Sequence, residues 1–138
     1  MTRKIYDIET IKLISLFENI TKSKLKDCFS DEKFIYFITQ PGMLGKAIGK
    51  KAVNVKNLEN KLNRKIKIIE FNPTDIQFVR NFIYPLKPKD IKKEGKIVII
   101  EGSDFKTKSL LIGRDSQNLK NLKKVVKRYF EVDEIKII

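Results

Sequence analysis

Histidine is absent from the chain, and cysteine occurs once in its 138 residues. Without histidine, the chain lacks the usual acid–base group near neutral pH and a common metal ligand. The lone Cys28 can form no disulfide within the chain, and no histidine is present to activate its thiol. The sequence also shows no paired carboxylates and no convincing metal-ligand spacing. We therefore expect no enzyme, no catalytic residue, no metal site and no cofactor.

Long apolar runs are missing as well. The longest, at residues 34–38 and 97–100, are far too short to span a bilayer, and residues 1–6 hold no stretch of signal-peptide length. No Walker loop and no dinucleotide fingerprint is found. We therefore expect a soluble, cytoplasmic protein without a membrane partner or a small-molecule substrate.

Acidic residues are scarce relative to basic ones, with 17 Asp and Glu against 30 Lys and Arg and a net charge of +13. Such an excess is typical of proteins that bind a polyanion, either nucleic acid or an anionic membrane surface. Codon bias toward A and T would raise Glu together with Lys, so it does not explain the excess. A merely solvated basic surface remains the alternative.

Hydrophobic residues make up 41% of the chain, and their spacing predicts two units with the same order of elements. In the first unit we expect a helix, two strands, two helices around a turn and a last strand, at 8–20, 24–29, 33–40, 43–48, 53–62 and 65–71. In the second we expect the same elements at 75–82, 89–93, 96–101, 105–112, 117–130 and 135–138. The predicted core includes Val55, Leu58 and Leu62 of the first unit and Leu119, Leu122, Val126 and Tyr129 of the second.

The amino-acid sequence itself repeats, in addition to the order of predicted elements. Residues 48–58, IGKKAVNVKNL, align without a gap on residues 112–122, IGRDSQNLKNL, and each unit ends in Ile-Lys-Ile-Ile. We therefore predict an α+β fold of two tandem domains, 1–72 and 73–138. Because half of this chain is near the lower limit for an independent core, we expect the two domains to pack on each other.

The turn between the paired helices carries the chemistry in each unit. Glycine lets the backbone bend sharply, and the free N–H groups and dipole of the following helix favour an anion such as phosphate. Basic residues surround both turns and could complete a clamp on a nucleic-acid backbone. The candidate residues for binding a nucleic-acid backbone are Lys46, Ile48, Gly49, Lys50, Lys51, Ala52, Asn54 and Lys56 in the first unit, and Lys108, Ile112, Gly113, Arg114, Ser116, Asn118 and Lys120 in the second.

The loop Ile-Gly-Lys-Lys-Ala, followed by Val-Asn-Val-Lys-Asn-Leu, resembles the GxxG signature of KH domains. In that family the loop clamps about four nucleotides of single-stranded backbone. The order of elements is similar to the type II form, αββααβ. Two such units in a chain of this length resemble the archaeal NusA family of transcription termination and antitermination factors. The resemblance covers nearly the whole chain and implies a single-stranded RNA-binding factor that acts with RNA polymerase.

The sequence departs from the GxxG pattern in both loops. Ala52 and Ser116 replace the second glycine, so a positive φ there would be strained. Asp115 places a negative charge where a phosphate would sit. We therefore expect the first loop to carry more of the RNA affinity than the second.

Several alternatives stay open at this stage. The chain could be a KH-fold scaffold that docks on RNA polymerase or a ribosomal component, or a KH protein linked to ribosome assembly or translation. The basic side chains at 120, 123, 124, 127 and 128 could contact RNA or be solvated. We expect Cys28, Phe34, Tyr36 and Phe37 to be core residues, and Gly42–Gly45, which also spells GxxG, to be a strand-to-helix connection.

Overall fold

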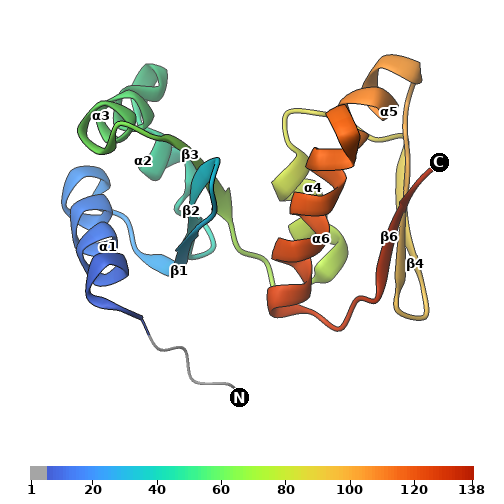
Figure 1. Cartoon of the computed structure of the whole chain (residues 1–138), viewed down its shortest axis with the longest axis horizontal. Coiled ribbons are helices and arrows are strands. Elements are labelled where there is room, and N and C mark those ends of the chain that lie inside the picture. Colours follow the sequence, from blue (N-terminus) through green and yellow to red (C-terminus); the bar gives the residue numbers. More distant parts are fainter. Residues whose placement is uncertain (1–5) are drawn as a thin grey trace. The chain divides into compact units, whose positions relative to one another are not determined.

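The computed structural model describes residues 6–138, in which it places six α-helices, two 3₁₀ turns and two three-stranded sheets (Figure 1). The chain divides into two units, Met1–Phe71 and Asn72–Ile138. Both units contain the predicted order of elements, and the α+β class is as predicted.

The first unit closely follows the predicted bounds. Its elements are α1 (Ile8–Thr21), β1 (Leu25–Ser30), β2 (Phe34–Thr39), α2 (Leu44–Ile48), η1 (Lys50–Ala52), α3 (Val53–Leu62) and β3 (Lys65–Glu70).

The second unit repeats them in the same order. Its elements are α4 (Asp75–Ile83), β4 (Asp90–Glu94), β5 (Ile97–Glu101), α5 (Phe105–Ile112), η2 (Arg114–Ser116), α6 (Gln117–Tyr129) and β6 (Glu134–Ile137).

Aspartates mark the start of one helix in each unit. The Asp7 carboxylate accepts a hydrogen bond from the backbone N–H of Thr10, 2.8 Å away, at the start of α1. Asp104 accepts one from the N–H of Thr107, at 2.6 Å, at the start of α5. These backbone hydrogen bonds lower the pKa of both carboxyl groups, since they stabilise the charged form.

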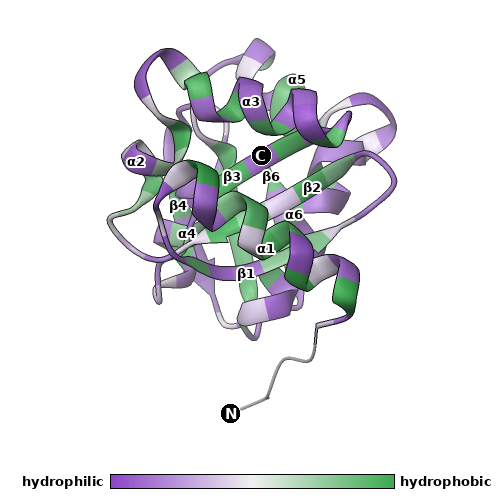
Figure 2. Cartoon of the chain, turned by 90° about the vertical axis from the view of Figure 1, so that its left-hand side faces the viewer, coloured by the Kyte–Doolittle hydropathy of each residue, from purple (hydrophilic) through white to green (hydrophobic). Residues whose placement is uncertain are grey.

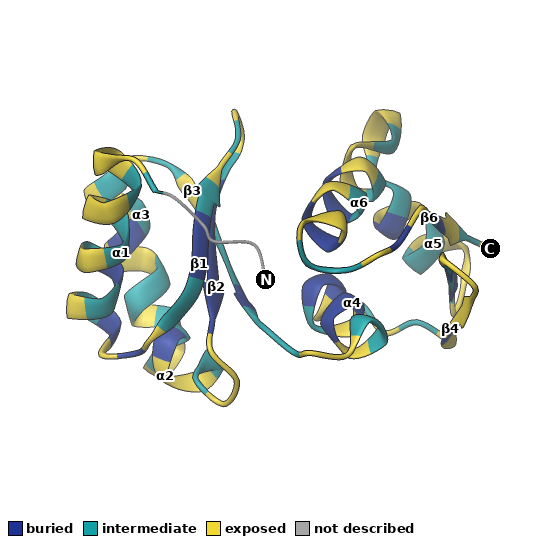
Figure 3. Cartoon of the chain, turned by 90° about the horizontal axis from the view of Figure 1, so that it is seen from below, coloured by how far each residue is buried: buried dark blue, intermediate teal, exposed yellow. Residues whose placement is uncertain are grey.

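The sheets place the glycine turns outside the strands. In the first sheet β2 is central and pairs antiparallel with β1 and parallel with β3, and β5 is central in the same way between β4 and β6. A parallel pair requires a crossover connection, which α2, η1 and α3 supply in the first unit. These helices and α1 lie on one face of the first sheet (Figure 3). The turn η1 therefore sits at the corner of the crossover.

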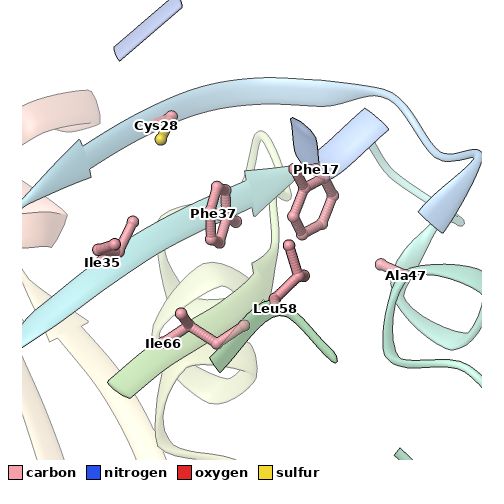
Figure 4. Close-up of a cluster of buried hydrophobic side chains, with 7 residues drawn as sticks. All are labelled: Phe17, Cys28, Ile35, Phe37, Ala47, Leu58 and Ile66. Carbon is pink, nitrogen blue, oxygen red and sulfur yellow. The ribbon is translucent and has the colours of Figure 1, made fainter. Parts of the chain in front are cut away.

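The core of the first unit lies between the sheet and its helices (Figure 4). Phe17 of α1 stacks on Phe37 of β2 with ring centroids 4.5 Å apart, and Leu58 of α3 is fully buried beside them. Cys28 is only 1% exposed, which confirms it as a small buried residue. Hydrophilic and hydrophobic bands alternate along the ribbons of α1 and α3 (Figure 2), as expected of helices that bury one side.

Some predicted core positions are more exposed than expected. Four are only half-buried: Val55, Leu62, Leu119 and Tyr129. On α6, Leu122 and Val126 are buried as predicted, and Asn121 and Val125, which precede them on the same two turns, widen the buried face. In the central strand β2, Tyr36 and Phe37 are buried as predicted, while Phe34 is half-buried.

Within residues 6–138, no helix combines the length and the apolar composition that crossing a membrane would need.

Candidate nucleic-acid interface

The two glycine turns follow the same backbone path. Gly49 has φ 78° and ψ 169°, and Gly113 has φ 76° and ψ 173°, a region that is essentially restricted to glycine. A Cβ atom at Gly49 would lie 2.8 Å from the Nδ2 atom of Asn54, and one at Gly113 would lie 2.6 Å from the Cγ atom of Asn118. Glycine is therefore required at both positions for two independent reasons.

The residues that close each turn are left-handed. Ala52 and Ser116 both have φ 59°, so the strain expected at these two positions is present. The residues before them, Lys51 and Asp115, are also left-handed, with φ 54° in each case, which the sequence did not predict. Left-handed backbone costs roughly 1–2 kcal/mol for each residue with a side chain. Such strain is typical of sites where the backbone conformation itself has a function.

The backbone strain at Ala52, the last residue of the first turn, can be tested by substituting glycine. Ala52→Gly removes the clash of Cβ with its left-handed backbone, a gain of roughly 1–2 kcal/mol, while the freer unfolded chain costs about 0.5–1 kcal/mol. We expect Ala52→Gly to leave the free energy of unfolding unchanged or raise it by about 1 kcal/mol, as measured by urea denaturation. Ala47→Gly, in the ordinary helical backbone of α2, serves as control and should lower it by about 1 kcal/mol or more. Similar losses in both variants would contradict the left-handed conformation.

Only some of the backbone N–H groups in the first glycine turn donate hydrogen bonds to other residues in the range 6–138. In the first turn, the N–H of Gly49 donates to the carbonyl of Gly45 at 3.0 Å, and the N–H of Ala52 donates to the carbonyl of Gly49 at 3.1 Å. Within the described part of the chain, the backbone N–H groups of Lys50 and Lys51 have no acceptor. Successive free N–H groups in such a turn, at the start of α3, form a concavity that favours an anion.

Basic side chains surround the first turn. Lys46, Lys50, Lys51 and Lys56 are all exposed, and none of them forms an ion pair with another residue in the range 6–138. Ile48 is half-buried at the end of α2. The predicted residues of the first unit thus lie on and beside one turn, and none of its four lysines has an acidic partner in the described part of the chain.

The second turn has the same shape but a different charge. Arg114 and Lys120 are exposed there, and Asp115 takes the place that Lys51 has in the first turn. Ile112 is half-buried at the end of α5. Lys108 lies in the first half of α5, next to Gly102, where a Cβ atom would come within 3.0 Å of the Cβ atom of Lys108.

Comparison with known proteins shows which family the chain belongs to. No protein-family model matches the chain. The chain is 33% identical over 133 residues to the probable transcription termination protein NusA of Methanocaldococcus jannaschii, which covers 94% of this chain and 73% of the relative. The chain belongs to the archaeal NusA family. The predicted resemblance is thereby confirmed.

Further comparisons agree with this family. The identity is also 33% to the protein of the same name from Methanococcus vannielii, covering 94% of this chain and 77% of the relative. It is 28% to the one from Halobacterium salinarum, covering 99% of both chains. The crystal structure of APE1850 shares the fold with a TM-score of 0.78, 24% identity, and coverage of 96% of this chain and 100% of that one.

The second GxxG in this NusA-family chain, Gly42–Gly45, leads from β2 into α2, as predicted: Gly42 and Met43 lie between the two elements, and Leu44 and Gly45 begin α2. The Glu70 carboxylate of β3 accepts hydrogen bonds from the N–H groups of Gly42 and Leu44, at 3.0 and 3.3 Å. The start of α2 therefore already holds an anion from its own unit. This is a physical reason why Gly42–Gly45, unlike the turn at Gly49, offers no place for a phosphate.

The basic face of α6 is partly used inside the second unit of this NusA-family chain. Lys123 is hydrogen-bonded and ion-paired with Glu134 of β6, and this contact lowers the pKa of the Glu134 carboxyl. Lys120, Lys124 and Lys127 are exposed. At least one of the five basic side chains of this face thus has a structural role.

Two apolar residues beside the turns were missed by the sequence analysis. Val53, at the start of α3, and Leu110, on α5, are each 46% exposed. Their counterparts in the aligned repeat are Gln117 and Lys46, so the repeat alone gave no apolar signal at either position. Both are exposed apolar side chains next to a glycine turn.

Proposed function

We propose that this member of the NusA family binds single-stranded RNA at its two glycine turns and acts with RNA polymerase in transcription termination or antitermination. The observation that carries the proposal is the first turn, where two backbone N–H groups and the side chains of four nearby lysines have no partner within residues 6–138. The names of the relatives, probable transcription termination proteins, support the role in transcription. The same proposal places the protein in the cytoplasm.

In this proposal each unit is a KH domain of type II, with the limits 1–72 and 73–138. The order of elements in both units supports the type II assignment. The sugar–phosphate backbone lies across Gly49, where the N–H groups of Lys50 and Lys51 bind a phosphate and the lysine side chains neutralise its neighbours. The second turn binds more weakly, because Asp115 repels the phosphate.

Salt dependence tests the phosphate contacts directly. The affinity for a short unpaired RNA should fall by roughly 0.7 log unit per log unit of salt for each phosphate neutralised. Fluorescence anisotropy with a labelled oligouridine measures this slope. Lys50→Gln combined with Lys51→Gln should reduce it by roughly 1.4, because two phosphate contacts are lost.

The matched control for this titration is Lys61→Gln combined with Lys65→Gln, which removes the same charge from exposed positions of the same unit. We expect the control to keep the slope of the unmodified protein. A salt response close to zero in the unmodified protein would rule out the proposed mode of binding.

A scaffold that docks on RNA polymerase or a ribosomal component, with little RNA binding of its own, is the second candidate. The acidic residue in the second turn, Asp115, is the observation that favours it. Capture of polymerase or ribosomal proteins that survives nuclease treatment, from a chain that does not bind oligonucleotides, would support the scaffold.

A further inference from the structure

One asparagine bridges each glycine turn. The Nδ2 group of Asn54, on the first turn of α3, donates a hydrogen bond to the carbonyl of Lys46 on α2, at 3.1 Å. In the second unit, Asn118 donates in the same way to the carbonyl of Leu110, at 2.8 Å. Both acceptors belong to the last turn of a helix, where carbonyl groups have no helical N–H partner. The same hydrogen bond thus ties the two helices together across the turn in both units.

The asparagine side chain also fills the space that glycine leaves open. At Gly49 an added Cβ would come within 2.8 Å of Asn54 Nδ2, and at Gly113 within 2.6 Å of both Cγ and Nδ2 of Asn118. The side-chain amide therefore packs on the glycine backbone as well as bonding to the neighbouring helix. In each turn, the asparagine side chain therefore contacts the glycine backbone and is hydrogen-bonded to the preceding helix at the same time.

We propose that Asn54 and Asn118 are positioning residues, which hold each turn in its phosphate-binding shape without contacting RNA themselves. This inference rests on the proposed function, and it changes the role expected from the sequence, where both residues were grouped with the RNA contacts. The reason is that a side-chain amide directed at a helix carbonyl is not directed at a ligand.

The backbone of the turn explains why such a tie is needed. Lys51 and Ala52 are consecutive left-handed residues with side chains, a conformation that is unfavourable unless the surroundings enforce it. Asn54 is uncharged, so its loss changes the shape of the turn but not the number of phosphates that the lysines neutralise. Affinity should fall, while its dependence on salt should not.

The test compares Asn54→Ala with Asn57→Ala in the full chain. Asn57 is exposed on the same helix, and its side chain makes no hydrogen bond within the described residues. Binding is measured with two probes, oligouridine and oligoadenosine. Asn54→Ala should lower the affinity for both by about three- to tenfold, with an unchanged salt slope. Asn57→Ala should bind like the unmodified chain.

A measurement without RNA completes the test. The N–H of Ala52 closes the turn by donating to Gly49, so its hydrogen exchange reports on the turn alone. We expect faster exchange at Ala52 in Asn54→Ala, with unchanged exchange in the strands, which also shows that the variant is folded. Asn54→Asp keeps the shape of the side chain but not the donor, and should loosen the turn as well.

The outcomes separate the inference from the proposed function. If the unmodified chain binds neither probe, the proposed function fails. If it binds and Asn54→Ala binds equally well, the positioning role is overturned. A loss confined to one probe would mean a contact with the bases, and a reduced salt slope would mean a contact with a phosphate, so either result would also overturn it.

Discussion

Lys50→Glu combined with Lys51→Glu should lower the affinity for single-stranded RNA by roughly three orders of magnitude at low salt, since each reversal turns an attraction of about 1 kcal/mol in water into a repulsion of the same size. Both side chains are exposed and without ion pairs within residues 6–138, so no internal partner offsets the change. Arg114→Glu, at the aligned position of the second turn, should cost clearly less. Titration of a labelled oligonucleotide at fixed salt gives both values.

The control for these variants is Lys61→Glu with Lys65→Glu, which changes the net charge equally but lies away from the turn. Its affinity should fall far less, by the long-range effect of net charge alone. Equal losses for the double variant Lys50→Glu with Lys51→Glu and for Arg114→Glu would contradict the ranking of the two turns. Asp115→Lys offers the reverse experiment: the backbone there has the same φ of 54° as at Lys51, so the new lysine fits, and affinity should rise.

The parts of the fold that were predicted correctly are those set by residues close together in the sequence. The bounds of α3 and α5 are those expected, because apolar spacing and the flanking glycine and aspartate are readable along the chain. The repeat of Ile48-Gly49 as Ile112-Gly113 locates both turns, and the structure gives them nearly identical φ and ψ values. Features that depend on neighbours in sequence were therefore predicted well.

Features that depend on residues far apart in the sequence were not predicted. The sequence does not show that Glu70 caps α2 from 26 and 28 residues away, or that Asn54 reaches back over 8 residues to Lys46. It also gives no sign that Lys51 and Asp115 are left-handed, because neither residue type requires that conformation. These details arise only when the two helices of the crossover pack, and they are the ones that shape the candidate site.

Gly49→Ala should be the most damaging single change at the turn, lowering the free energy of unfolding by about 2–4 kcal/mol. Alanine at Gly49 meets an unfavourable φ of 78° and a Cβ contact of 2.8 Å with Asn54 Nδ2, followed by one of 3.1 Å with Val53 Cγ1. Gly113→Ala should be at least as damaging to the second unit, since its Cβ would approach Asn118 to 2.6 Å. Denaturation in urea, followed by circular dichroism, measures both losses.

Two other glycines separate the causes of that loss. Gly95 has a positive φ of 61°, but a Cβ atom there would have no neighbour within 4 Å. Gly95→Ala should therefore lower the free energy of unfolding by only about 1–2 kcal/mol, the effect of the left-handed backbone alone. Gly45→Ala, within α2 and also without neighbours, should be neutral or stabilise by up to about 1 kcal/mol. If Gly49→Ala cost no more than Gly95→Ala, the close packing of asparagine on glycine would be wrong. If removing the side chain in Gly49→Ala with Asn54→Ala recovers part of the loss, the two residues are in direct contact, because only neighbours couple in this way.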